Sequence, residues 1–244
     1  MSVVAKLLVV DVGNTSIKYT AFEKGQIQWQ VRDHEHLTKP YFLPEAIYFA
    51  SVRSQVASLA LQQEVQAYYP NSQLIVLEST AQACGVVCAY EEPWRLGIDR
   101  WLTVVAGFHH YGGNIVIVDA GTAIKVDVVN EQARHLGGYI VPGLMMMENA
   151  LLANTAKIRY DASEHKVGVG LPNSTARAVN EGCYQMALGF LERVYGNYHD
   201  HRWIVTGGDA QELLKTLGIE AECDPHLVAL GAKLVGDEMM RKQV

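Results

Sequence analysis

The sequence predicts an α/β protein made of two related half-domains, residues 1–113 and 114–244. Short apolar runs typical of buried strands alternate with longer segments of helical spacing. A strand, a tight turn and a returning strand open the chain and recur about half a chain later, which favours a duplicated domain over a solenoid. Hydrophobic residues make up 49% of the 244 residues, enough for a sizeable core.

The first half-domain should open with an antiparallel meander. The apolar run over 6–10 predicts a buried strand that ends at Asp11, and strands joined by a glycine turn should follow over 17–22 and 26–31. Beyond a loop at 34–36, the expected elements are a strand over 46–52, a helix over 55–69, a strand over 74–77 and a helix over 99–110.

The second half-domain should repeat this opening, with a strand over 115–118 that ends at Asp119 and a returning strand over 123–129. The boundary should lie near Gly112-Gly113, because no low-complexity linker separates the halves. The later expected elements are a strand over 137–141, helical Met145 to Met147, a loop over 163–173, a helix over 174–195, a strand over 203–206 with a helix behind it, and a last helix over 226–240.

The repeated turn carries chemistry that suits a nucleotide phosphate. In both copies the strand ends at an Asp, and a Gly, a polar residue and an Ile-Lys pair follow. An Asp at a buried strand end is costly unless it meets a cation or donors, and the Gly lets the backbone approach a ligand closely. The turn N–H groups and polar side chains can hold phosphate oxygens, and the carboxylates suit Mg²⁺. A lone Asp-x-Gly is a common turn, but two copies with matching flanks predict an ATP clamp.

Composition and charge argue against several other classes of protein. The net charge of −6 disfavours nucleic acid or an anionic membrane as the main partner, because both require clustered Lys and Arg. The N-terminal apolar run reaches Asp11 too soon for a signal peptide or a membrane span, so we expect a cytoplasmic protein. Cys84 and Cys88 lack the CxxC spacing, which favours reduced structural thiols.

Together these residues resemble the superfamily of actin, sugar kinases, acetate kinase and heat-shock chaperone ATPases, in which two ribonuclease H-like half-domains hold ATP in the cleft between them. Within that superfamily, the chain is similar in detail to the type III pantothenate kinases. The matching blocks follow the family's order and span 11–18, 97–100, 119–123, 137–143 and 206–209. Each block is weak alone, but together they are specific.

The resemblance implies a reaction and its participants. ATP would phosphorylate pantothenate to 4'-phosphopantothenate, the first step of coenzyme A biosynthesis. The resemblance also implies a requirement for Mg²⁺, a further requirement for a monovalent cation, K⁺ or NH₄⁺, and a homodimer.

The substrate residues implied by the resemblance centre on Gly-x-Asp-Arg. Asp99 would be the general base, since transfer to an alcohol requires a carboxylate in reach of the hydroxyl; alternatively it only stabilises a helix N-terminus. Arg100 would grip the pantothenate carboxylate, or else form a structural ion pair. Thr175 would contact substrate, often across the dimer, or simply cap its helix. The full substrate set is Tyr90, Gly97, Ile98, Arg100 and Thr175.

The nucleotide and metal residues come from the two turns and a later glycine pair. Asp11 should help to hold Mg²⁺, and Asp119 matches the family's ligand for the monovalent cation. The nucleotide set is Asp11, Val12, Gly13, Asn14, Thr15, Ser16, Ile17, Lys18, Thr122, Gly207 and Gly208. For the glycine pair, an ordinary strand-to-helix turn is the alternative.

Lys125 departs from the family pattern, which usually has a hydroxyl residue at this position. On a strand, Lys125 and Asp127 share one face with Ala123. We hypothesise that the Lys125 ammonium lies near Asp119 and weakens or replaces the monovalent-cation requirement. The alternative is that Lys125 points to solvent or pairs with Asp127.

Other functions remain open on the same scaffold. A kinase for a sugar or carboxylate would use the same clamp but would have no special reason to carry Gly-x-Asp-Arg. A chaperone-like or regulatory ATP-binding protein would not require Asp99. A phosphatase or polyphosphate hydrolase would place water where the alcohol sits, and would release phosphate without an acceptor.

Overall fold

The computed structural model describes residues 4–33, 42–164 and 168–242. The expected loop at 34–36 lies outside these residues, as do positions 165–167 of the loop expected over 163–173. The chain divides into two compact units: unit one holds 1–115, 127–137 and 226–244, and unit two holds 116–126 and 138–225. The half-domain boundary after residue 113 rests on the sequence repeat and stays a prediction.

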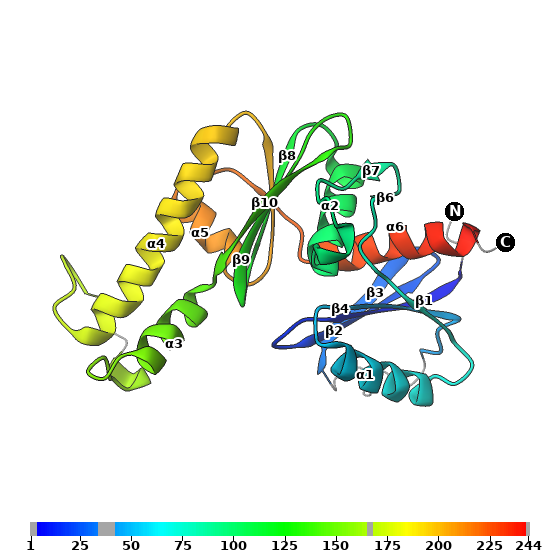
Figure 1. Ribbon diagram of the computed structural model, residues 1–244, viewed down its shortest axis with the longest axis horizontal. Helices are drawn as coiled ribbons and strands as arrows, with labels where there is room; N and C mark the ends of the chain where they lie inside the picture. Colours follow the sequence, from blue (N-terminus) through cyan, green and yellow to red (C-terminus); the bar gives the residue numbers. More distant parts are fainter. Residues whose placement is uncertain (1–3, 34–41, 165–167, 243–244) are drawn as a thin grey trace. The chain divides into compact units, whose positions relative to one another are not determined.

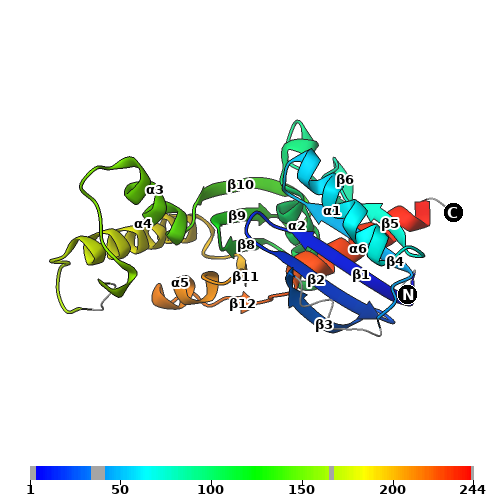
Figure 2. The ribbon, with the colours of Figure 1, turned by 90° about the horizontal axis from the view of Figure 1, so that it is seen from below.

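The first sheet has the strand order β3-β2-β1-β4-β5. Its strands are β1 (Lys6–Val12), β2 (Ile17–Glu23), β3 (Gln26–Arg32), β4 (Ala46–Ser51) and β5 (Gln73–Val76). The opening strands β1, β2 and β3 form an antiparallel meander, while β4 pairs parallel with both β1 and β5. Figure 2 shows the meander as three blue strands side by side. The predicted meander is therefore confirmed.

Helices cover both faces of this sheet in unit one (Figure 1). They are α1 (Gln55–Tyr68) on one face, and α2 (Ile98–Tyr111) with α6 (Leu227–Lys242) on the other. Leu8 and Phe49 lie in one buried cluster with Val65 of α1. The preceding side chain of β4, Tyr48, points the other way and donates a hydrogen bond of 2.8 Å to Asp237 of α6. Burial on both faces explains why β1 and β4 are almost continuously apolar.

The second sheet has the order β10-β9-β8-β11-β12. Its strands are β8 (Ile115–Ala120), β9 (Ala123–Val129), β10 (His135–Pro142), β11 (Arg202–Thr206) and β12 (Glu222–Cys223). Taken in chain order, these strands occupy the same places as those of the first sheet. The duplication read from the turn motif thus extends to sheet topology, and the predicted α/β fold class is confirmed.

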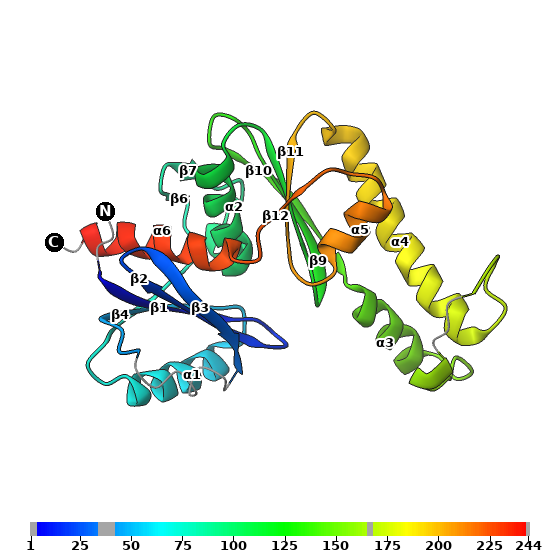
Figure 3. The same cartoon turned by 180° about the vertical axis from the view of Figure 1, so that it is seen from behind.

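Unit two carries the remaining helices, which Figure 3 shows in green, yellow and orange. They are α3 (Leu144–Asn154), α4 (Thr175–Tyr198) and α5 (Ala210–Thr216). The long helix α4 packs against both α3 and α5. It buries Leu188 and Leu191 while Met186 on its other side is exposed. No described helix combines the length and the apolar character needed to cross a membrane.

Most expected helices and strands agree with the structure to within a few residues at their ends, but α3 continues to Asn154, well beyond the expected Met145 to Met147. The smallest elements were missed. They are the hairpin β6 (Gln82–Ala83) and β7 (Val86–Val87), the 3₁₀ turns Pro93–Arg95 and Ala162–Glu164, and β12. The hairpin turn places Cys84 at φ 48° and Gly85 at φ +81°, a left-handed pair typical of a two-residue hairpin loop.

Candidate active site

The first repeated turn joins β1 to β2 in unit one. The Gly13 N–H donates to the Ser16 carbonyl oxygen at 3.0 Å and closes the turn. Asn14 and Thr15 are exposed at its tip. The half-buried Asp11 lies directly opposite Lys18 in the β1–β2 ladder. An acidic strand end, a lysine and an exposed polar turn are a chemical set that suits a phosphate with its metal ion.

The flanks of this turn are held from two sides. The Arg53 Nε donates to the Gly13 carbonyl oxygen at 2.8 Å, and the Ile17 N–H donates to Asp33 Oδ1 at 2.9 Å. Val12 is buried, so only its backbone can face a ligand. Sequence reasoning missed Arg53. Arg53 lies two residues beyond the end of β4, the strand parallel to β1. That position could have indicated that it lies near the turn after β1.

The second repeated turn joins β8 to β9 in unit two. The Gly121 N–H donates to the Ala123 carbonyl oxygen at 3.1 Å, and the Gly143 N–H donates to the Thr122 carbonyl oxygen at 3.1 Å. A Cβ at Gly143 would overlap the Gly121 carbonyl oxygen. The Pro-Gly end of β10 therefore packs backbone to backbone on the turn, and Thr122 at the turn is exposed.

A third turn, after β11, packs on the same strand end. The Asp209 N–H donates to the Ala120 carbonyl oxygen at 3.1 Å. Gly207 has φ +87°, and a Cβ there would overlap that carbonyl oxygen and lie 2.6 Å from Asp119 Oδ1. Gly208 has open space around it. Only a glycine at 207 allows this approach, so Thr122, Gly207 and Asp119 are brought together at one end of the second sheet.

Asp119 and Lys125 form an ion pair within this turn. The Lys125 Nζ lies 2.5 Å from Asp119 Oδ2, and the side chains are only 18% and 20% exposed. The geometric part of the Lys125 hypothesis is confirmed. Asp127, the alternative partner, instead accepts hydrogen bonds from Arg100 and His135.

The second matching block, residues 97–100, begins helix α2 in unit one. Gly97 is the N-cap, and Asp99 lies in the first turn, half-buried, with its Oδ1 accepting from the Arg100 N–H at 2.8 Å. A Cβ at Gly97 would lie 2.7 Å from that Oδ1. Gly97 therefore makes room for the carboxylate.

The guanidinium of Arg100 is committed to protein partners. Its Nε and Nη2 donate to the two oxygens of Asp127 at 2.9 and 2.6 Å, and its Nη1 donates to the Tyr90 hydroxyl at 3.0 Å. Burial acts to lower the pKa of Arg100, but the hydrogen bonds and charge of Asp127 outweigh it and the pKa is raised. The structural ion pair considered above is thus present, and a substrate contact by Arg100 stays a prediction.

His135 completes a buried cluster around Arg100. Its Nδ1 accepts from the Ala89 N–H at 3.5 Å, so the Nε2 donates to Asp127 Oδ1 at 2.9 Å. The Tyr90 ring stacks on the His135 ring, with centroids 6.3 Å apart, and lies 5.8 Å from the Arg100 guanidinium carbon. Asp127 and His135 were not predicted as site residues. The sequence pattern that could have indicated them is an Asp within an apolar strand, because a buried carboxylate requires hydrogen-bonding or charged partners.

Thr175 is the first residue of α4 and is exposed. The helix is capped instead by Ser174, whose Oγ accepts from the Arg177 N–H at 3.4 Å. The capping role considered for Thr175 is therefore wrong. The buried Arg177 also binds Glu181 at 2.7 Å and fixes the start of the helix, so Thr175 is presented on an ordered turn.

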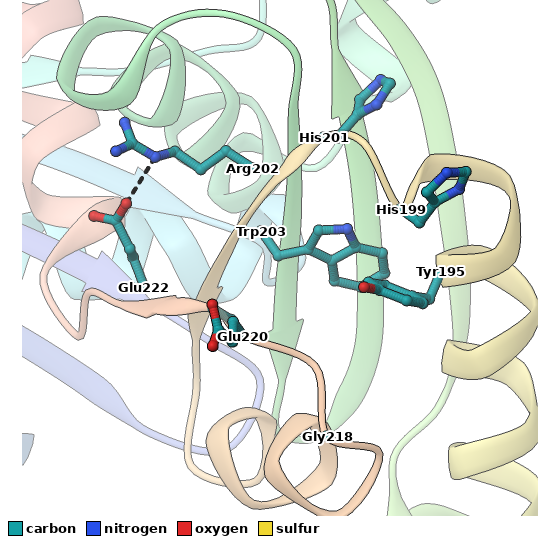
Figure 4. Close-up of a pocket in the computed structure, with 9 residues that line it drawn as sticks. Tyr195, His199, His201, Arg202, Trp203, Gly218, Glu220 and Glu222 are labelled. Atoms are coloured by element: carbon teal, nitrogen blue, oxygen red, sulfur yellow. Dashed lines mark ion pairs between the residues drawn. The ribbon is translucent and has the colours of Figure 1, made fainter.

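A cavity lined only by residues of unit two lies away from these turns. It measures about 660 Å³ and is lined by residues near the end of α4, along β11 and before β12. Figure 4 shows Trp203 and Tyr195 on one side and the Arg202–Glu222 ion pair, 2.7 Å long, on the other. None of the predicted site residues lines it.

Comparison with known proteins identifies the family. Residues 7–197 match the model of the type III pantothenate kinases. A type III pantothenate kinase of Marinomonas sp. is 61% identical over 241 residues, covering 99% of both chains. A type III pantothenate kinase of Alcanivorax borkumensis is 33% identical over 94% of this chain and 98% of its own.

Solved structures agree on the fold. A Campylobacter jejuni protein named for the Baf family of transcriptional activators has a TM-score of 0.60 at 20% identity, over 97% of this chain and all of its own. Component A of (R)-2-hydroxyglutaryl-CoA dehydratase from Acidaminococcus fermentans has a TM-score of 0.51 at 13% identity, over 97% and 98%. At these identities the likeness shows the fold alone. On the sequence matches, the chain belongs to the type III pantothenate kinase family.

Proposed function

We propose that this chain phosphorylates pantothenate with Asp99 as the general base. Membership of the family gives ATP as the phosphoryl donor and places the reaction at the entry to coenzyme A biosynthesis. The observation that carries the role of Asp99 is its geometry. A carboxylate in the first turn of α2 is fixed by the Arg100 N–H, beside a glycine that leaves room for it.

The chemistry follows from that placement. Asp99 accepts the proton of the pantothenate hydroxyl as the oxygen attacks the terminal phosphorus of ATP. The new oxygen–phosphorus bond forms, the bond to the bridging oxygen breaks, and ADP leaves. The protein mainly positions the reactants and stabilises charge, since phosphoryl transfer requires little covalent participation by the enzyme.

We assign the pantothenate carboxylate to the neighbourhood of Tyr90 and Arg100. The Asp127 carboxylate binds the Nε and Nη2 atoms of Arg100. The substrate carboxylate would therefore approach the guanidinium at Nη1, next to the Tyr90 hydroxyl. Backbone groups of Gly97 and Ile98 at the start of α2 would approach the acceptor end of the substrate. Thr175 would contribute its hydroxyl, as an exposed residue at the start of an ordered helix.

We assign the phosphates of ATP to the two repeated turns and the adenosine to Gly207 and Gly208. Asp11 fits Mg²⁺, because it offers half-buried carboxylate oxygens at a strand end beside the exposed turn, and Mg²⁺ is usually held by one or two carboxylates with phosphates and water. When bound, Mg²⁺ would neutralise phosphate charge. The chain's own part is to hold the turn through the Gly13 hydrogen bond and Arg53.

A free monovalent cation fits Asp119 poorly. One oxygen of its carboxylate, Oδ2, already pairs with the Lys125 ammonium at 2.5 Å. The residues present therefore do not fit the free monovalent cation that the resemblance implies.

The chain should act as a homodimer in the cytoplasm. Exposed apolar side chains on β10, α3 and α4 of unit two support a protein interface, since large exposed apolar residues often mark one. They are Tyr139, Ile140, Met145, Met146 and Met186. The described cysteines are all free thiols, which suits a reducing compartment.

The test is ADP formation from MgATP with and without pantothenate. Asp99→Asn should lower kcat by about 10²- to 10⁴-fold, the usual contribution of general-base catalysis, with little change in melting temperature. Asp200→Asn serves as the control, because Asp200 has a 70% exposed side chain. ADP release that does not require pantothenate would point to a hydrolase or regulatory ATPase instead. ADP formation with another alcohol but not with pantothenate would show that pantothenate is not the substrate.

A further inference from the structure

The Lys125–Asp119 pair brings a positive charge to the second repeated turn. Both side chains are about four-fifths buried, and Asp119 lies beside the Gly207 turn assigned to adenosine. Burial of a carboxylate and an ammonium to this extent costs free energy unless the two groups remain paired. The ammonium is thus a fixed part of the turn rather than a surface charge with many alternative positions.

The repeat explains how a lysine reaches this position. In the first turn, Asp11 lies opposite Lys18 on the returning strand. In the second, the same Ile-Lys pair follows Asp119, with a turn that is one residue shorter, and the two charged groups meet at 2.5 Å. Both copies of the motif therefore present a lysine beside the acidic strand end.

A lysine ammonium has the charge of K⁺ and the donor chemistry of NH₄⁺. It forms a compact, singly charged centre with three rotatable donors. A free monovalent ion at Asp119 would have to displace Lys125 from the same carboxylate. The Lys125 ammonium loses no translational freedom when it binds Asp119, because the chain already holds it in place. A free ion loses that freedom, so its binding to the same carboxylate is less favourable.

We propose that the Lys125 ammonium takes the place of a free monovalent cation at Asp119, so that phosphoryl transfer by this chain does not depend on K⁺ or NH₄⁺. The inference rests on the proposed function, because Asp119 is placed beside the nucleotide by that assignment.

The first experiment compares pantothenate-dependent ADP formation in KCl, NH₄Cl and tetramethylammonium chloride at equal ionic strength. Wild-type rates should agree within about two-fold, since the tethered charge is always present. Lys125→Thr should lose about ten-fold or more in tetramethylammonium chloride and recover in KCl, because breaking a buried pair leaves a carboxylate without its cation. Lys215→Thr, which removes an exposed lysine of the same unit, should behave like wild type.

The second experiment measures melting temperature in the same salts with a non-hydrolysable ATP analogue, and requires no turnover. KCl should raise the melting temperature of Lys125→Thr but not that of wild type, because an ion that binds only the folded state stabilises it. A wild-type enzyme that requires K⁺, or a wild-type melting temperature that rises selectively with K⁺, would overturn the inference and leave the kinase assignment intact. ADP formation that ignores pantothenate in every salt would overturn the proposed function, while the melting series still tests the cation site.

Discussion

Arg100 and Asp127 form a buried, two-point ion pair that joins the first turn of α2 to strand β9. The two contacts measure 2.9 and 2.6 Å, and each side chain is 3% exposed. Because Arg100 follows Asp99 directly, the pair anchors the turn that presents the proposed base. His135 donates to the same carboxylate, so Asp127 neutralises the guanidinium and orients two neighbours.

Asp127→Ala should therefore be strongly destabilising. The variant leaves a buried guanidinium without its counter-charge, and loss of one partner of a buried pair costs about 3–5 kcal/mol. Urea denaturation would measure the free energy of unfolding. The matched comparison is Glu222→Ala, which breaks the half-exposed pair with Arg202 and should cost less than about 1 kcal/mol. Equal losses in the two variants would contradict the structural role given to Asp127.

Gly97→Ala should reduce turnover more than stability. The added Cβ would lie 2.7 Å from Asp99 Oδ1 and would push the carboxylate away from its place. We expect kcat to fall by about ten-fold or more, since small displacements of a reacting group are costly, with a nearly unchanged melting temperature. Gly196→Ala on α4 adds the same methyl group in open space and should leave kcat unchanged. An unaffected Gly97→Ala enzyme would argue against Asp99 as the base.

Gly207→Ala and Gly208→Ala should differ in their effect on folding, although both glycines belong to one turn. Alanine at 207 would adopt φ +87° and overlap the Ala120 carbonyl oxygen, whereas position 208 has open space. The strain should lower the free energy of unfolding by about 1–3 kcal/mol at 207 and by a few tenths at 208. Thermal unfolding of both variants measures the difference, and similar melting temperatures would show that the turn relaxes.

Arg53→Ala should raise the KM for ATP without raising that for pantothenate. Arg53 braces the first phosphate turn through the Gly13 carbonyl oxygen at 2.8 Å. Loss of a charged hydrogen bond of this kind costs about 1.5–3 kcal/mol, which should appear in nucleotide binding because the turn loses its rigid support. Steady-state kinetics with each substrate varied in turn would measure both constants. A selective rise in the pantothenate KM would contradict the assignment of this turn to ATP.

Alkaline pH should unfold the protein through its buried tyrosines. Burial raises the pKa of Tyr19 from 10.0 to about 12, and burial together with the Asp237 hydrogen bond raises the pKa of Tyr48 further. Above pH 10 the unfolded chain releases these protons while the folded chain keeps them, so stability falls as pH rises. Each tyrosine should contribute a slope of about 1.4 kcal/mol per pH unit.

Urea midpoints measured between pH 9 and 12 would test this pH dependence. Tyr48→Phe should be less stable at pH 8, because Asp237 loses a hydrogen bond of 2.8 Å. It should also lose stability less steeply above pH 10, since one titrating group is gone. An identical slope in the variant would show that Tyr48 does not carry this effect.

The sequence predicted the strand ends well because their chemistry is local. An apolar run that stops at Asp11 or Asp119 and continues with glycine specifies a buried strand and a turn. The position of Lys125 was harder, because Asp119 and Asp127 were both plausible partners. The structure decides it through Arg100, whose guanidinium comes from another element and takes the Asp127 carboxylate. Which carboxylate pairs with Lys125 therefore depends on contacts with distant parts of the chain, and the spacing of residues along one strand does not predict those contacts.

His135 and Arg53 were missed for the same reason. His135 acts through Asp127, on the neighbouring strand, and Arg53 acts through the Gly13 carbonyl oxygen, forty positions earlier in the sequence. Neither lies in a recognisable motif. The Cys84-Gly85 hairpin was missed because its strands are two residues long, too short for a periodic pattern.

The Lys125–Asp119 pair supplies its charge at one copy per chain. Because the ammonium is covalently attached to the chain, it lies beside Asp119 in every folded copy, whatever the ionic composition of the solution. An enzyme that takes its cation from solution would change its rate with the concentration of that ion. With the ammonium built into the turn, the rate of this enzyme would stay the same when the potassium concentration around it changes.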